Sequence, residues 1–90
     1  MSELGFETRD AARRFERAAL LASYLLVLMH LERCGGKDRG DWIKQATGAD
    51  SRQLHAMRDQ GLVEKLHRTS PVAWAAAEGW RHTLERLKAE

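Results

Sequence analysis

The stretch SRQLHAMRDQGLV, residues 51–63, decides the fold that we predict for this chain of 90 residues. Leu54 and Met57 stand three positions apart, which places both on one side of a helix and most of the polar side chains on the other sides. Gly61 can adopt the left-handed conformation that ends a helix, and an apolar pair follows it. The stretch therefore predicts a short amphipathic helix that turns directly into a strand.

A second short helix is predicted immediately before this stretch, over residues 41–47, with Gly48 as its end. Its apolar face would consist of Trp42, Ile43 and Ala46. Asp50 or Ser51 is a suitable N-cap for the next helix, because its side-chain oxygen can accept from the free backbone N–H groups of the first turn. The two helices and the turn between them make a helix-turn-helix unit over residues 41–61.

A β-hairpin is predicted over residues 62–76. LVEKLHR alternates between apolar and polar residues, TSP at 69–71 is a turn signal, and residues 72–75 form the returning strand. The alanines at 75–77 also suit a helix. A last helix follows over residues 78–90, with Trp80, Leu84 and Leu87 on one face.

The N-terminal part predicts one long helix over residues 8–34, preceded by a frayed segment at 1–7 and followed by a glycine-rich loop at 35–40. The second half of this helix is apolar nearly all round, so it must be covered on more than one side. Two interpretations remain open. Either the other elements of the same chain bury it, with Phe15 and the alanines packing on the same core, or residues 8–28 also form a homodimer surface.

Composition indicates one small globular domain spanning residues 1–90, because 43% of the residues are hydrophobic and 31% are charged. The net charge of +2 permits nucleic-acid binding without requiring it. The single cysteine, Cys34, excludes an intramolecular disulfide and fits a reducing compartment. The acidic N-terminus is unlike a secretory signal, and the most apolar run is too short to span a bilayer. We therefore expect a soluble cytoplasmic protein.

The order of the elements, together with the pattern L-x-x-M-x-x-x-G-L-V at Leu54 to Val63, resembles winged helix-turn-helix proteins, in particular bacterial regulators of the MarR and ArsR kind. The resemblance runs from about Leu20 to Leu87. It implies a mostly α fold with a small β-hairpin wing and a long N-terminal helix, and a small DNA-binding transcriptional regulator that is homodimeric through that helix. The third helix is about one turn shorter at its N-terminal end than in typical DNA-reading members.

If double-stranded DNA is the partner, the resemblance places the contacts on the third helix and the wing. The candidate residues are Lys44, Ser51, Arg52, Gln53, His55, Arg58, Lys65, His67 and Arg68. Arg52 and Gln53 could reach base edges, since a guanidinium suits guanine and a carboxamide suits adenine. Lys44, Lys65 and Arg68 would instead hold phosphates. The same residues could also be the solvated surface of a small helix and a hairpin.

The alternative is a protein-interaction module of the same fold that does not bind DNA, as in small phage inhibitors and assembly adaptors. The potential around the third helix discriminates between the two, because a continuous positive surface favours DNA and a mixed or apolar one favours a protein. No catalytic motif is present, so we expect no enzyme and no cofactor.

His30 and Cys34 stand four positions apart on one helix, a spacing that can bring two metal ligands together. A metal site needs one or two further ligands, and the other histidines lack a diagnostic spacing, so no metal is expected. A redox role for the thiol of Cys34 is a further alternative. We expect the three tryptophans, Trp42, Trp74 and Trp80, to be anchors of the core.

Overall fold

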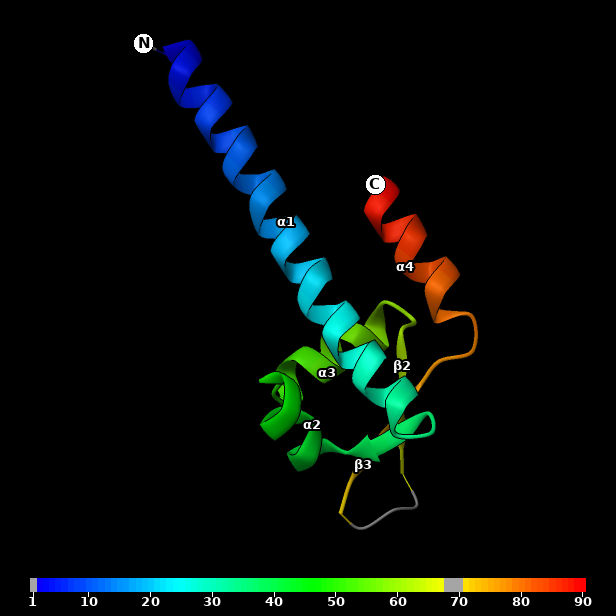
Figure 1. Cartoon of the computed structure of the whole chain (residues 1–90). Coiled ribbons are helices and arrows are strands. Elements are labelled where there is room, and N and C mark those ends of the chain that lie inside the picture. The colour runs from blue at the N-terminus through cyan, green and yellow to red at the C-terminus, as the bar shows by residue number, and fades with distance from the viewer. Residues whose placement is uncertain (1, 68–70) are drawn as a thin grey trace.

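The computed structural model describes the backbone of residues 2–67 and 71–90 and the side chains of residues 9–67 and 71–90. In chain order, these residues form α1 (Ser2–Arg33), β1 (Lys37–Arg39), α2 (Gly40–Thr47), α3 (Ser51–Asp59), β2 (Val63–Leu66), β3 (Ala73–Ala76) and α4 (Trp80–Ala89) (Figure 1). The fold is thus mostly helical with a small antiparallel sheet, as the sequence predicted.

Helix α1 is longer than predicted. It begins at Ser2, so residues 2–7, which we expected to be frayed, are helical. The segment 2–33 holds no proline and one glycine, Gly5, whose cost of about 1 kcal/mol is small against a helix of this length. The helix ends where Gly36 donates its N–H to the carbonyl of Leu31 (2.7 Å) and Gly35 donates to Glu32 (3.3 Å). Gly35 has a φ of 81°, the left-handed conformation that this helix ending requires.

Strand β1 corrects the prediction of an unbroken loop at 35–40. The sheet has the order β1-β3-β2, with both neighbouring pairs antiparallel. Trp74 in β3 faces Asp38 of β1 on one side and Lys65 of β2 on the other. Lysine, aspartate and arginine give no local strand signal, so only the free edge of β3, distant in sequence, could select this pairing.

Helices α2 and α3 agree closely with the predicted ranges. Asp50 is the N-cap of α3, and its Oδ1 accepts from the backbone N–H of Gln53 at 2.9 Å. Gly61 follows α3 with a φ of 81°, as expected, and Leu62 donates its N–H to Met57 at 3.0 Å. The hairpin strands lie within the predicted 62–76, and the returning strand is shifted by one residue to Ala73–Ala76.

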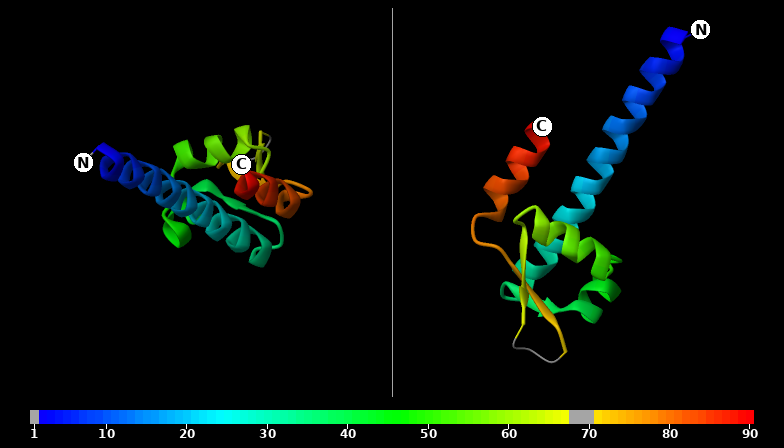
Figure 2. Two further views of the ribbon diagram at one scale, coloured as in Figure 1. Left: turned by 90° about the horizontal axis from the view of Figure 1, so that it is seen from above. Right: turned by 180° about the vertical axis from the view of Figure 1, so that it is seen from behind.

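Helix α4 begins two residues later than predicted and lies antiparallel to α1. Near its start, Arg81 donates to both carboxylate oxygens of Glu32 (2.8 and 2.6 Å). Near its end, the carbonyl of Leu87 accepts from Arg17 at 2.7 Å. Figure 2 shows the consequence, since α4 flanks the middle and end of α1 while the N-terminal part of α1 extends beyond it.

One core joins all four helices and the sheet. Its buried members are Leu21, Tyr24, Val27, Leu28, Leu31, Ile43, Ala49, Leu54, Met57, Leu62, Val63, Trp74, Trp80 and Leu84. Phe15 is not among them. Its side chain is 75% exposed, so the expectation that it packs on this core is wrong. The reason is that Phe15 lies on the same side of α1 as the exposed Leu26 and Met29, away from the core.

The prediction that Trp42 anchors the core is also wrong. It is 54% exposed, and Ala46 is exposed as well, so Ile43 alone of the predicted apolar face of α2 is buried. The guanidinium of Arg39 lies 5.2 Å from the Trp42 ring centroid. Trp74 and Trp80 are buried, as expected. Successive residues of a helix point about 100° apart, so the side of α2 that buries Ile43 leaves Trp42 directed to solvent.

Candidate nucleic-acid interface

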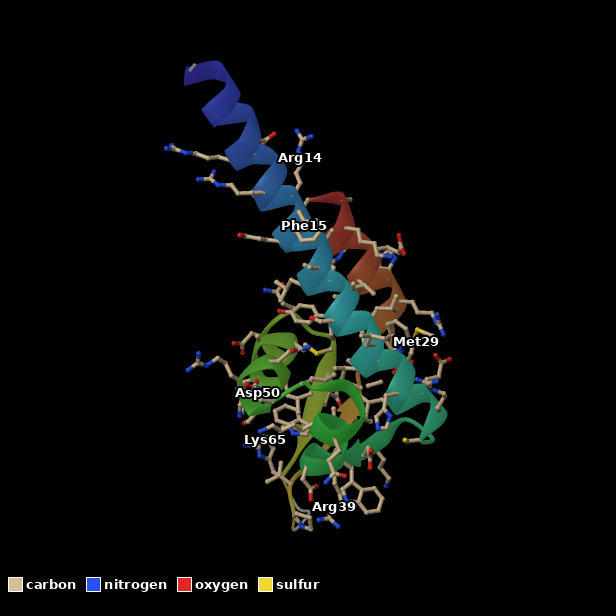
Figure 3. All side chains as sticks on the ribbon, turned by 60° about the vertical axis from the view of Figure 1, so that its left-hand side comes forward. Arg14, Phe15, Met29, Arg39, Asp50 and Lys65 are labelled. Atoms are coloured by element: carbon tan, nitrogen blue, oxygen red, sulfur yellow. The ribbon has the colours of Figure 1, made fainter. Side chains whose placement is uncertain are left out.

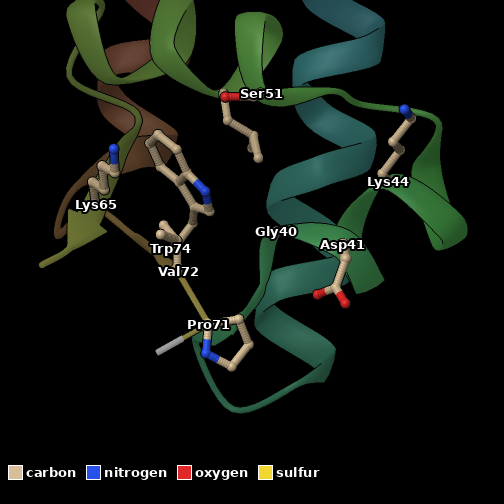
Figure 4. Close-up of a pocket in the computed structure, with 9 residues that line it drawn as sticks. Gly40, Asp41, Lys44, Ser51, Lys65, Pro71, Val72 and Trp74 are labelled. Atoms are coloured by element: carbon tan, nitrogen blue, oxygen red, sulfur yellow. The ribbon is translucent and has the colours of Figure 1, made fainter. Parts of the chain in front are cut away.

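The start of α3, helix α2 and the β2–β3 hairpin surround a hollow of about 480 Å³ (Figure 4). Its lining consists of Gly40, Asp41, Lys44, Ser51, Leu54, Lys65, Pro71, Val72 and Trp74. Leu54 and Trp74 are the two buried apolar side chains of this lining. Three of the nine predicted DNA-binding residues, Lys44, Ser51 and Lys65, therefore meet around one depression, although they come from three different elements.

The two lysines stand on opposite sides of this hollow (Figure 4). Lys44 is exposed on α2, and Lys65 is half-buried on β2. The ammonium nitrogen of Lys65 lies 5.9 Å from the centroid of the Trp74 ring, which favours a cation over the ring face. Both cations and the hydroxyl-bearing Ser51 thus border the same hollow.

Arg52 and Arg58 are the exposed bases of α3. The helix buries Leu54 and Met57 against the core, which leaves both arginines on its solvent side. Arg58 lies 4.0 Å from the carboxylate of Asp59, a long and exposed pair that constrains it little. Both guanidinium groups are thus free to meet a partner outside the chain.

Two predicted contacts, Gln53 and His55, are directed elsewhere. The side-chain amide of Gln53 donates to the hydroxyl of Ser23 on α1 at 3.4 Å, on the side of α3 that faces the rest of the molecule. The ring of His55 is half-buried and packs edge-on against Trp74. These two residues orient α3 relative to α1 and β3. The alternation of residues in the sequence could not show this, because it depends on which helix lies behind α3.

The last two predicted contacts belong to the tip of the hairpin. His67 is exposed at the end of β2. Arg68 lies outside the described residues, as do Thr69 and Ser70 of the predicted turn. Pro71 is exposed and lines the hollow.

The charge around α3 is mixed. Residues 40–67 hold four bases and four acids, so this part of the chain has no net charge. The bases are Lys44, Arg52, Arg58 and Lys65, and the acids are Asp41, Asp50, Asp59 and Glu64. Asp50 is occupied as the helix cap, and Asp41 accepts from Arg39 at 2.9 Å. Asp59 lies beside Arg58, so three of the four acids have partners within the chain.

A second cluster lies away from this surface, where α1 meets β1. One ligand-type atom each of His30, Cys34 and Asp38 lie within 4.8 Å of one another. The sequence pointed to the first two residues and missed Asp38, because the strand that carries Asp38 was not predicted. A repeat of potential ligands every fourth position, H-x-x-x-C-x-x-x-D, is the signal that could have found it.

Comparisons with protein-family models, with curated proteins and with solved structures find no match for this chain. Within the described part of the chain, none of the helices combines the length and the apolar character needed to cross a bilayer. The function must therefore be argued from the geometry of the two sites.

Proposed function

We propose that this protein is a winged helix-turn-helix protein that binds double-stranded DNA as a small transcriptional regulator. The observation that carries the proposal is the hollow at the start of α3, where Lys44, Ser51 and Lys65 converge beside the exposed arginines of that helix. In such proteins the second helix of the pair enters the major groove with its N-terminal residues towards the bases. Here that end of α3 forms the rim of the hollow.

The proposal gives each basic residue a distinct role. Arg52, in the first turn of α3, is placed to meet base edges. Lys44 and Lys65 flank that turn from α2 and β2 and neutralise phosphates on either side. Arg58, near the other end of the helix, meets the backbone. Gln53, by contrast, holds α3 against α1 through Ser23 and does not read a base.

In this proposal the protein forms a homodimer, and α1 forms the interface between the two copies. Six apolar residues on this helix recur at alternating steps of three and four, and all are exposed: Ala12, Phe15, Ala19, Ala22, Leu26 and Met29. Apolar residues at alternating steps of three and four form the contact seam of a coiled coil, and small alanines let two helices approach closely. Phe15 and Met29, near the two ends of this stripe, are labelled in Figure 3. Phe15 is 75% exposed and Leu26 54%, which is a large apolar surface for a single chain to leave in water.

A twofold dimer presents two copies of α3, so the DNA site would be a palindrome of two half-sites. The direct test is a titration of the purified protein against a random duplex at low and at moderate salt, read by fluorescence anisotropy. We expect binding that weakens steeply with salt, because neutralised phosphates release counterions. Absence of binding at low salt would reject DNA as the partner.

One observation favours a second function, a protein-interaction module that does not bind DNA. The equal number of acids and bases over residues 40–67, together with the exposed Trp42, gives a mixed surface rather than a uniformly positive one. In that case the random duplex gives no change in anisotropy at any salt concentration. Isolation of a partner with immobilised wild-type protein, but not with a Trp42→Ala variant, would then support this function.

A further inference from the structure

The donor atoms of His30, Cys34 and Asp38 surround one point. Nε2 of His30 lies 2.7 Å from Oδ2 of Asp38, and the same nitrogen lies 3.6 Å from Sγ of Cys34. The triangle closes with 3.9 Å between Sγ and Oδ2. A nitrogen, a sulfur and an oxygen thus lie close together where the end of α1 meets β1.

This geometry is not that of an activated thiol. In a nucleophile, histidine and carboxylate relay, the carboxylate holds one ring nitrogen while the nucleophile uses the other. Here both the thiol and the carboxylate approach Nε2. The thiol and the carboxylate therefore share one ring nitrogen, and the three side chains do not form such a relay.

We propose that His30, Cys34 and Asp38 bind a divalent metal ion of borderline softness, Zn²⁺ in the first place. Zinc binds thiolate, imidazole and carboxylate at about 2.0–2.3 Å, which puts the donor atoms of a tetrahedral site about 3.4–3.6 Å apart. The contact of Cys34 with His30, 3.6 Å, agrees with these separations. The contact of Cys34 with Asp38, 3.9 Å, is longer and must shorten when the metal binds. The His30 to Asp38 distance of 2.7 Å is that of a hydrogen bond, and it must widen when the metal replaces the shared proton.

The choice of metal follows from the donors. A thiolate is a soft ligand that Mg²⁺ and Ca²⁺ disfavour, whereas one sulfur, one nitrogen and one oxygen suit Zn²⁺ and, in its place, Co²⁺. Binding needs the thiolate of Cys34 and neutral His30. The thiol proton is therefore released to water, and the proton between His30 and Asp38 moves to Nδ1 of the ring.

The backbone holds the three ligands in place before any metal arrives. Cys34 is the last residue before the left-handed Gly35, and its N–H donates to His30 (3.1 Å) and Leu31 (3.0 Å). Asp38 is fixed through its other carboxylate oxygen, Oδ1, which accepts from the N–H of Arg39 at 2.8 Å. This leaves Oδ2 directed at the centre. The side chains of His30 and Asp38 are 17% and 13% exposed, so bulk water competes weakly for these positions.

A fourth ligand would come from solvent. The cluster opens onto a shallow hollow of about 530 Å³, which Lys37, Trp42, Gln45 and Ala46 also line. Cys34 is exposed on this side, so an ion can enter without a change of fold. Three protein ligands and one water form the open coordination of zinc sites that are not purely structural.

The test is a titration of the full-length protein with Co²⁺, after reduction with a phosphine and removal of metals with a chelator. A Co²⁺–thiolate bond gives a charge-transfer band in the near ultraviolet, and four-coordination gives intense visible bands. We expect both to saturate at one ion per chain and to disappear when Zn²⁺ is added. No DNA is involved, so this result is independent of the proposed function.

Three variants and one control test whether Co²⁺ binds at His30, Cys34 and Asp38. Cys34→Ser should abolish the charge-transfer band, and His30→Gln and Asp38→Asn should each weaken Co²⁺ binding by at least about tenfold. His82→Gln changes an exposed histidine on α4 and should leave binding unchanged. Circular dichroism of the metal-free variants checks the fold, and the exposed Cys34 is the position least able to disturb it. Unchanged binding in both His30→Gln and Asp38→Asn would show that the thiol acts alone, and absence of the band in the wild type would overturn the proposal outright.

Discussion

The ring of His55 meets the ring of Trp74 edge to face, with centroids 5.0 Å apart and planes inclined at 84°. This contact joins α3 to the central strand of the sheet, and the ammonium group of Lys65 lies near the same indole. The packing of Trp74 therefore sets the position of the proposed reading helix relative to the hairpin.

Replacement of His55 by alanine should lower the free energy of unfolding by about 1 kcal/mol, because an aromatic pair contributes roughly 0.5–1.5 kcal/mol beyond its buried area. Urea denaturation measures this change. Arg52→Ala is the matched control on the same helix, and since Arg52 is exposed its effect should stay within about 0.5 kcal/mol. Equal stability of the two variants would mean that His55 does not support α3.

Gly40→Ala tests the close approach of α2 to the sheet. A Cβ at Gly40 would lie 3.3 Å from Nε1 of Trp74, and Trp74 is 3% exposed and held between two strands, so it cannot easily withdraw. We expect a loss of about 1 kcal/mol in the free energy of unfolding, at the low end of the cost of overpacking. Lys44→Ala, on the exposed side of the same helix, should be neutral. A more stable Gly40→Ala protein would show that helix propensity outweighs the contact.

Arg52→Ala and Lys65→Ala distinguish a contact with a base from a contact with a phosphate. On a duplex obtained by selection, Arg52→Ala should cost about 1–3 kcal/mol and relax the preference at one base pair. Lys65→Ala should weaken binding to all DNA sequences alike, because it removes one phosphate contact. It should also reduce the slope of the logarithm of the binding constant against the logarithm of the salt concentration by about 1. Anisotropy titrations at several salt concentrations measure both effects. Wild-type affinity in both variants would place the DNA contact elsewhere.

Phe15→Ala tests the homodimer. Because Phe15 is 75% exposed, its truncation should leave the stability of the folded chain unchanged but raise the dissociation constant of the dimer at least about tenfold. Sedimentation equilibrium measures that constant. The neighbouring Arg14→Ala removes a pair with Asp10 within the same helix and should leave the dimer intact. A wild-type protein that stays monomeric at high concentration would contradict the dimer.

Tyr24 should make the stability of the fold depend on pH in the alkaline range. Burial raises the pKa of its phenol from the ordinary value of 10.0, so the folded state holds the phenolic proton more tightly than the unfolded state. Its contribution is fully present below pH 10.0 and is lost as the pH rises through the raised pKa. Tyr24 is the single tyrosine, so the absorbance of the phenolate reports its titration directly. In Tyr24→Phe, the loss of stability above that pH should be smaller than in the wild type, and an equal loss would contradict the assignment.

Local signals in the sequence were sufficient for α2, α3 and the hairpin. The Asp50 cap, the left-handed Gly61 and the apolar pair after it act over a few residues, and each is found where it was expected. The same holds for the spacing of Leu54 and Met57, which determined the buried side of α3. Such features depend on backbone geometry and periodicity, and these are properties of a short segment.

The tertiary structure decided what each side chain faces. Helix periodicity could not show that Phe15 lies on the side of α1 away from the core, that Trp42 points to solvent, or that Gln53 turns towards α1. Each outcome depends on where elements that are distant in the sequence lie in the folded chain. Strand β1 exists because β3 has a free edge, and it alone carries Asp38 to His30 and Cys34. The sequence by itself thus determined the elements and their order, whereas both candidate sites arose only when long-range packing brought those elements together.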